Sequence, residues 1–172
     1  MNEGSYSDTL VKVEVPKGKI FLRYFMVAVA AILLVIGLGI FLQNPGLFII
    51  FLIIDVVLIW FLPPVKIEYE YVYVDGQIDF DRIIAGNSRK NMARVDLENA
   101  IVVAEENSHD LDSYKNLKPK NFSSNREDQK HYVIVVNGGE SGNYSVKFTP
   151  DETLLKEMKD KSPFKVKTEF YH

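Results

Sequence analysis

The chain has 172 residues, of which 47% are hydrophobic and 25% charged, and its formal net charge is -3. It contains no cysteine, which excludes a disulfide framework, a thiolate metal site and a cysteine nucleophile. Nucleic-acid-binding domains usually carry a basic excess, so the slightly acidic balance argues against a nucleic-acid partner. These averages conceal two unlike parts, because the only charged side chains between Ile20 and Leu62 are Arg23 and Asp55.

Two apolar segments follow a polar start. Residues 20–42 are long enough for a helix to cross a hydrocarbon core of about 30 Å. Residues 43–46, Gln-Asn-Pro-Gly, predict a tight turn, because Pro lacks an N–H donor while Asn and Gly tolerate unusual backbone angles. Residues 46–62 form a second apolar run at the short end of the spanning range, and Pro63 and Pro64 end it. We therefore expect a membrane α-hairpin of two transmembrane helices over residues 20–64, retained in the protein rather than removed as a signal peptide.

Positive charges flank the two apolar segments and are absent from the turn between them. They are Lys12, Lys17, Lys19 and Arg23 before the first segment, and Lys66, Arg82, Arg89 and Lys90 after the second. Because positively charged flanks remain on the cytoplasmic side, we expect a multi-pass plasma-membrane protein with both termini cytoplasmic. The expected parts are a cytoplasmic N-terminal segment over residues 1–19, the hairpin over 20–64, and a cytoplasmic β-rich domain over 65–172.

Asp55 conflicts with its surroundings, because it lies near the middle of the second apolar segment. An ionisable residue at the centre of a spanning helix costs roughly 2.5–3.5 kcal/mol on insertion scales. A proton or ion relay would require further polar groups along a path, and the first segment supplies none between Tyr24 and Leu42. We favour a packing or assembly role for Asp55, with transport as the alternative.

After the hairpin, the sequence predicts a mainly β domain. Residues 66–71 alternate charged with apolar or aromatic side chains, which is typical of a strand with one buried face. Asp75 and Gly76 suit a type I′ turn, and alternation resumes over residues 77–81, so the first two strands are expected to form an antiparallel hairpin. Further strands are expected over residues 91–97, 100–104, 131–136 and 143–148, with turns at 85–88 and 137–139.

One amphipathic helix is predicted near the C-terminal end. Thr149 is the expected cap, Pro150 suits the first helical position, and Glu152 completes a capping box. The apolar stripe consists of Leu154, Leu155 and Met158, and Pro163 ends the helix. A last short strand is expected where Val166, Thr168 and Phe170 alternate with polar residues.

This order, a run of antiparallel strands closed by one C-terminal helix, is that of a pleckstrin-homology-like fold, either an antiparallel sheet or an open barrel. The sequence also resembles an uncharacterised family of bacterial two-helix membrane proteins. The likeness rests on residues 107–114, Asn-Ser-His-Asp-Leu-Asp-Ser-Tyr, together with the Tyr-rich first strand and the helix start at residues 149–158. It implies a membrane hairpin and a cytoplasmic pleckstrin-homology-like domain, and it brings no established activity.

Residues 105–130 are poor in apolar side chains and predict a long loop, a kind of segment that is often functional. His109, Asp110, Asp112 and the neighbouring Glu105 and Glu106 carry metal-ligand chemistry, but their spacing fits no compact ligand motif. We therefore expect no metal there. Instead, Ser108, Asp112 and Ser113 are expected to bond the local backbone, while Leu111 and Tyr114 hold the loop against the sheet.

Basic residues form the other candidate surface. Arg89, Lys90 and Arg94 cluster near one turn, and a membrane-tethered domain can place such side chains on anionic headgroups, each contact contributing about 1 kcal/mol. The alternative is a solvated surface whose positive field is cancelled by neighbouring carboxylates. The candidate interaction residues are thus Asp55, Arg89, Lys90, Arg94, His109, Asp112 and Tyr114.

The expected function is a membrane-anchored cytoplasmic interaction module, non-enzymatic, with a membrane or cytoplasmic protein as partner. The alternative is a small accessory subunit of a transporter or envelope complex, with Asp55 in a membrane interface. A phosphate-binding glycine loop, a nucleophile elbow and a zinc-protease motif are all absent from the sequence, so no catalytic residue and no cofactor are expected. A membrane-tethered enzyme remains a third hypothesis.

Overall fold

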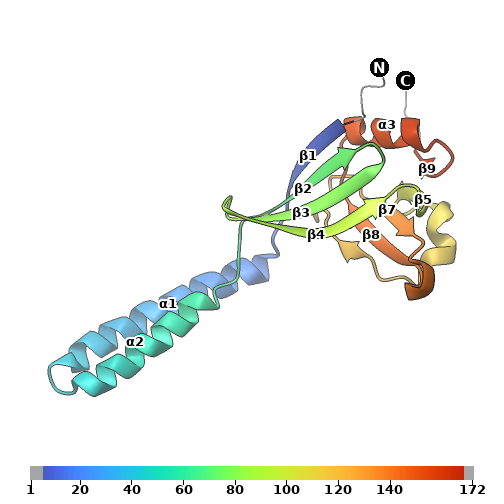
Figure 1. Cartoon of the computed structure of the whole chain (residues 1–172). Helices are drawn as coiled ribbons and strands as arrows, with labels where there is room; N and C mark the ends of the chain where they lie inside the picture. Colours follow the sequence, from blue (N-terminus) through green and yellow to red (C-terminus); the bar gives the residue numbers. More distant parts are fainter. Residues whose placement is uncertain (1–5, 169–172) are drawn as a thin grey trace. The chain divides into compact units, whose positions relative to one another are not determined.

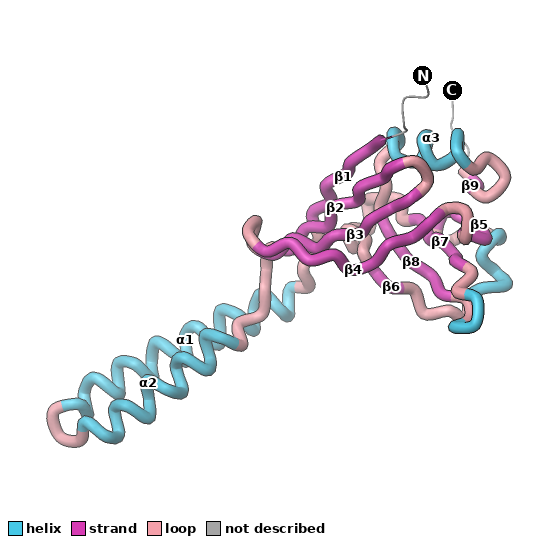
Figure 2. Tube along the Cα trace, in the orientation of Figure 1, coloured by secondary structure: helices cyan, strands magenta, loops and turns pink. Residues whose placement is uncertain are grey.

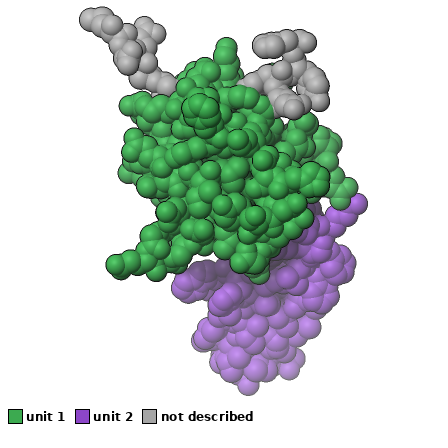
Figure 3. All heavy atoms as spheres, turned by 90° about the vertical axis from the view of Figure 1, so that its right-hand side faces the viewer, with its two compact units in different colours: residues 1–14, 66–172 green, residues 15–65 purple. Residues whose placement is uncertain are grey.

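The structure is a computed structural model in which residues 6–168 are described. It consists of two compact units (Figure 3). One unit is Val15–Val65, and the other combines Met1–Glu14 with Lys66–His172. The first unit is helical and the second is mainly β (Figures 1 and 2).

The helical unit is a pair of adjacent helices, α1 (Lys17–Phe41) and α2 (Pro45–Trp60). Asn44 caps α2, because its side-chain oxygen accepts a hydrogen bond from the Leu47 N–H at 3.1 Å, and Pro45 occupies the first turn. Gly37 allows the two helices to approach closely: a Cβ at this position would lie 3.2 Å from Phe48 Cδ2 and 3.3 Å from Phe51 Cβ.

By length and composition, α1 can cross a membrane. Only 11% of its apolar window is buried, whereas the core helix of a soluble protein would be mostly covered. The second helix, α2, is equally apolar in character but shorter, with 16 residues. The chain turns between Phe41 and Pro45, so of the predicted turn at residues 43–46 only Gln43 and Asn44 lie in it, and Pro45 and Gly46 begin α2. The helix ends at Trp60, before the predicted boundary at residue 62.

The β unit contains two sheets. The first has the order β1 (Tyr6–Lys12), β2 (Ile67–Val74), β3 (Gln77–Ile84) and β4 (Ser88–Asp96), with antiparallel neighbours throughout. The turns between β2 and β3 and between β3 and β4 place two residues each at positive φ: Asp75 with Gly76, and Ala85 with Gly86. The first is the two-residue connection expected at Asp75 and Gly76, whereas the second has three residues, Ala85 to Asn87, between Ile84 and Ser88.

The second sheet has five strands in the order β6-β8-β7-β5-β9. Its elements are β5 (Ala100–Glu105), β6 (Lys120–Asn121), β7 (Tyr132–Val136), β8 (Tyr144–Phe148) and β9 (Val166–Lys167). The main core lies between inward side chains of the two sheets and is closed by Leu154, Leu155 and Met158 of α3 (Glu152–Lys161). The predicted mainly β domain with one C-terminal helix is confirmed.

Strand β1 was not predicted, because residues 1–19 were expected to be a separate segment. Instead β1 pairs with β2 over seven positions, from Tyr6 opposite Val74 to Lys12 opposite Glu68. Its inward side chains are Ser7, Thr9 and Val11, two of which are polar, so the apolar alternation that marks a half-buried strand is missing. Its partner strand also lies beyond the whole helical unit in sequence.

The segment expected to be a long loop is partly ordered. It contains η1 (His109–Tyr114), a 3₁₀ helix, and the short strand β6. Leu111, Tyr114 and Leu117 pack on a second apolar cluster formed by Val102, Ala104, Val133 and Val135. The expectation that Leu111 and Tyr114 hold this segment against the sheet is confirmed.

The predicted start of the C-terminal helix was wrong by two residues. Asp151, not Thr149, is the cap: its side chain accepts a hydrogen bond from the Leu154 N–H at 2.8 Å. The last strand is confirmed over Val166–Lys167, where it pairs parallel to β5, while Phe170 lies outside the described residues.

We predict that Asp151→Ala lowers the free energy of unfolding by about 0.5–2 kcal/mol, because α3 loses its side-chain cap. Chemical unfolding of the full chain in mild detergent measures this change. Asp151→Asn is the control, since it keeps the accepting oxygen. Equal losses for both variants would show that the cap hydrogen bond is not the cause.

Candidate functional site

The helical unit is inserted at one end of the β1–β2 ladder. Lys12 lies opposite Glu68, and the Val13 N–H donates to the Ile67 carbonyl at 3.0 Å. The chain thus leaves the β unit after Glu14 and returns at Lys66, at neighbouring points of one antiparallel ladder. Both connections to the helical insertion therefore continue from the same pair of strands.

Asp55 is the one charged residue of α2, and its side chain is buried, with 7% of its surface exposed. Among the residues that the structure describes, neither of its carboxyl oxygens has a hydrogen-bond partner. Arg23 is the one basic residue between Ile20 and Leu62. Its guanidinium already donates to the Pro63 carbonyl at 2.9 Å. A buried carboxyl without a donor is costly, so Asp55 is the residue of this unit that most requires an explanation.

The predicted basic cluster is largely neutralised by ion pairs across the first sheet. Arg94 Nε and Nη2 bind the carboxylate of Asp79 at 2.6 and 2.8 Å. Arg89 binds Asp81 at 2.7 Å and Glu70 at 2.5 Å. The hydrogen bonds to these carboxylates raise the pKa of both arginines. Lys90, the third basic residue of this cluster, is exposed on β4 and has no ion pair among the described residues.

His109 and Asp112 lie on the surface of η1. His109 Nδ1 is 3.3 Å from Asp112 Oδ2, and Lys115 Nζ is 2.8 Å from Asp112 Oδ1. Hydrogen bonds from Lys115 and then from His109 lower the pKa of Asp112. Within residues 6–168, no group of three or more His, Asp or Glu side chains is arranged to hold a metal ion. Ser108 caps η1 by accepting from the Asp110 N–H at 3.2 Å, as expected.

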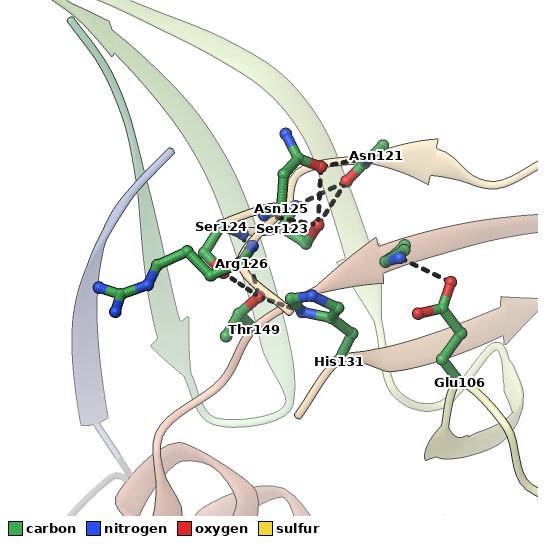
Figure 4. A network of polar contacts seen from close by, with 9 residues as sticks. Glu106, Asn121, Ser123, Ser124, Asn125, Arg126, His131 and Thr149 are labelled. Carbon is green, nitrogen blue, oxygen red and sulfur yellow. Dashed lines mark hydrogen bonds and ion pairs between the residues drawn. The ribbon is translucent and has the colours of Figure 1, made fainter. Parts of the chain in front are cut away.

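A buried polar network joins several elements of the β unit, and the sequence analysis missed it (Figure 4). Thr149 Oγ1 accepts from the Ser124 N–H at 3.0 Å and lies 2.9 Å from His131 Nδ1. Both Ser123 and Ser124 are fully buried. The Glu14 N–H donates to the Ser124 carbonyl at 2.7 Å, so the network also fixes the end of the β1 segment that leads to the helical unit.

Tyr71 completes the network from the core side. Its hydroxyl donates to the Phe122 carbonyl at 2.6 Å and accepts from the Thr149 N–H at 3.2 Å. Burial raises the pKa of this hydroxyl, although the hydrogen bond from Thr149 opposes the shift. The sequence contained a signal for this contact. Alternation along β2 places Tyr71 on the inward face, and a buried tyrosine hydroxyl requires a hydrogen-bond partner.

We predict that Tyr71→Phe lowers the free energy of unfolding by about 1–3 kcal/mol at pH 7, because a buried carbonyl and a buried N–H both lose their partner. The effect depends on pH. A tyrosine in the unfolded chain titrates near pH 10, and the folded-state pKa of Tyr71 is higher. Stability from Tyr71 is therefore fully present below pH 10 and is lost as the pH rises above it.

Urea unfolding of both proteins at neutral and alkaline pH measures this dependence. The difference between wild type and Tyr71→Phe is expected to shrink above pH 10, since the other tyrosines contribute equally to both. If the difference in unfolding free energy between the two proteins stays constant with pH, the pKa of Tyr71 is not raised in the folded state.

A groove with a volume of about 860 Å³ lies beside this network. Residues 8–12 of β1 form one side, and Arg126, Tyr132, Thr149 and Leu155 are among the residues of the other. Arg126 extends toward β1 (Figure 4) and is ion-paired with Asp128 at 2.7 Å, which raises the pKa of Arg126. The groove thus has polar and charged walls and one wall made of a sheet edge.

Two packed sheets closed at one end by a C-terminal helix define a PH-like domain, here with a helical pair inserted between its first two strands. The chain belongs to the bacterial PH-like domain family DUF6106, whose profile matches residues 3–168. The matched range includes residues of both units. Comparison with curated proteins gives no match, and comparison with solved structures gives none.

Proposed function

We propose that this protein is a membrane-anchored interaction module whose PH-like unit is held at the cytoplasmic face by a hairpin of two membrane-spanning helices. The observation that carries the proposal is the β1–β2 ladder. If α1 alone crossed the bilayer, β1 and β2 would lie on opposite sides and could not form seven paired positions. Their pairing supports an even number of crossings, as in a hairpin that enters and leaves on one side.

The shorter helix is compatible with this role. At 1.5 Å per residue, α2 spans about 24 Å, somewhat less than a hydrocarbon core of about 30 Å. The apolar residues Phe61 and Leu62 extend it, and local thinning of the bilayer accommodates such a mismatch at modest cost. The positive flanks and the uncharged turn favour a cytoplasmic location for both termini in the plasma membrane.

An interaction role fits the β unit better than catalysis. The polar groups of its buried network, Ser124, Thr149 and Tyr71 among them, bond one another and the backbone, and thereby fix loops and strand ends. The recognition surfaces are the exposed Lys90 and the polar groove beside β1. Contact of Lys90 with anionic headgroups stays a prediction; we expect one such exposed lysine to contribute only about 1 kcal/mol.

Cell fractionation tests the anchoring. The full chain is expected in the membrane pellet after alkaline carbonate washing, which removes peripheral proteins and leaves spanning ones. A control chain in which residues 14–66 are replaced by Asn-Gly is expected in the soluble fraction. Release of the full chain by carbonate would contradict the proposal.

The second candidate function is a small accessory subunit of a transporter or envelope complex. One observation favours it: the two carboxyl oxygens of Asp55 are buried without a partner in the described part of the chain. A donor from another membrane protein would offset the cost of this group. Substitutions at Asp55 separate this role from simple anchoring, and their expected results are given in the Discussion.

A further inference from the structure

Among residues 6–168, no strand pairs with the outer edge of β1, so this edge has hydrogen-bonding groups available for another strand. In an antiparallel ladder, alternate residues bond the neighbouring strand, and the residues between them point away. Val13 bonds Ile67 of the β2 segment, whereas the Glu14 N–H points to the other side, where it bonds Ser124. The same alternation directs the N–H and C=O groups of Asp8, Leu10 and Lys12 toward the free edge, away from β2.

These three residues also share one face of the sheet. Asp8, Leu10 and Lys12 are all exposed, with 56% of the Leu10 surface open to solvent. Along the edge they present an acidic, an apolar and a basic side chain at every second position. A strand added to this edge would place its own side chains directly opposite them, where unlike charges and apolar pairs are favourable.

The groove beside β1 provides room for one added strand. Its volume of about 860 Å³ is within the range of about 300–1,000 Å³ found for ligand sites. Thr9 lies in its wall, is 8% exposed, and its Oγ1 has no hydrogen-bond partner among the described residues. Because Thr9 Oγ1 is itself buried, the side chains that an added strand meets on this edge are those of Asp8, Leu10 and Lys12.

We propose that the β1 edge binds an extended peptide of a protein partner as an additional antiparallel strand, with the pattern acidic-x-apolar-x-basic. In this orientation the acidic residue lies opposite Lys12, the apolar residue opposite Leu10, and the basic residue opposite Asp8. Main-chain hydrogen bonds supply affinity, and the three cross-strand pairs select the sequence. This inference rests on the proposed function, because it names the partner of the interaction module.

The probe is a blocked, fluorescent heptapeptide, Tyr-Ser-Asp-Thr-Leu-Val-Lys, which has the required pattern because it repeats residues 6–12. Binding to the full chain in phosphatidylcholine nanodiscs is measured by fluorescence anisotropy. The control peptide exchanges its Asp and Lys. We expect the first peptide to bind at least tenfold more tightly, and the double variant Asp8→Lys with Lys12→Asp to reverse that preference.

Two changes test the main-chain hydrogen bonds. Leu10→Pro removes an N–H that points away from β2, so the β1–β2 ladder is retained and peptide affinity is expected to fall at least tenfold. Leu10→Ala keeps the N–H and controls for the lost side chain. If Leu10→Pro fails to fold, a peptide N-methylated at its leucine replaces it, with the same expected loss.

Absence of binding at millimolar peptide would overturn the inference, as would equal binding of the charge-exchanged peptide. A dimer of the chain that forms through β1 and excludes the peptide would also overturn it, with a second copy as the occupant. Carbonate extraction is independent of these results. A carbonate-resistant chain without peptide binding contradicts only this inference, whereas a released chain that binds the peptide contradicts only the anchoring.

Discussion

Replacing residues 14–66 by Asn-Gly, so that a two-residue turn joins Val13 to Ile67, is expected to yield a soluble, folded β unit. Val13 and Ile67 are a hydrogen-bonded pair, which is the position that a tight two-residue turn connects. Size-exclusion chromatography, circular dichroism and thermal unfolding measure the result. A monomer with mainly β circular dichroism and a cooperative transition is expected.

A chain that begins at Lys66 is expected not to fold, although it contains the domain that the sequence predicted. Without β1, the sheet loses seven paired positions and β2 becomes an exposed edge. Tyr71 and Tyr73, which are fully buried in the intact unit, lie on this newly exposed strand. Domains have a free energy of unfolding of only about 5–15 kcal/mol, and the loss of an entire strand is expected to remove most of it.

The two chains form a matched pair, because both lack the helices and only one retains β1. Equal folding of both would show that β1 is dispensable and that the domain begins after the helical insertion. Aggregation of both would show that the helices themselves are required for the β unit to fold.

If Asp55 bonds another membrane protein, as the second candidate function proposes, Asp55→Leu is expected to have opposite effects on the isolated protein and on that complex. In the isolated chain, the substitution removes a buried carboxyl without a partner and should stabilise the helical pair. The gain approaches the roughly 2.5–3.5 kcal/mol that insertion scales assign to a charged residue at the centre of a spanning helix. Thermal unfolding of the purified protein in detergent measures this gain.

In the cell membrane, the Asp55→Leu variant should no longer bind a partner protein that donates a hydrogen bond to Asp55. Asp55→Asn is the control, since it keeps the shape and the hydrogen-bonding capacity but cannot release a proton. Native gels of mild detergent extracts are expected to show the complex with Asn and a smaller species with Leu. Loss of function in both variants with the complex intact would instead indicate proton or ion movement. A Leu variant that keeps its assembly, abundance and function would exclude both roles.

Local sequence patterns predicted most of the β unit because its signals are short-range. Alternation over β2 and β3, the turn at Asp75 and Gly76, and the apolar stripe of α3 all lie within windows of ten residues. The class of fold followed from their order. The cap of α3 was misplaced because Thr149 and Asp151 are both good cap residues, and tertiary contacts with Ser124 engage Thr149 elsewhere.

Strand β1 and the candidate site depend on contacts between distant residues, which no local pattern contains. Ser7 and Thr9 are polar but buried, so only pairing with β2 across the helical unit reveals β1 as a strand. Arg89 and Arg94 looked available in sequence, yet carboxylates on neighbouring strands bind both. The groove beside β1 joins residues from four separate parts of the chain.

Single-cysteine labelling tests the membrane hairpin most directly, because the natural chain has no cysteine to interfere. Asn44→Cys lies between α1 and α2, and His109→Cys replaces a fully exposed side chain of the β unit. With an impermeant maleimide on intact spheroplasts, Asn44→Cys should react, and His109→Cys should react only after the membrane is permeabilised. Labelling of His109→Cys without permeabilisation, or protection of Asn44→Cys that permeabilisation relieves, would contradict a hairpin that crosses the membrane and returns to the cytoplasm.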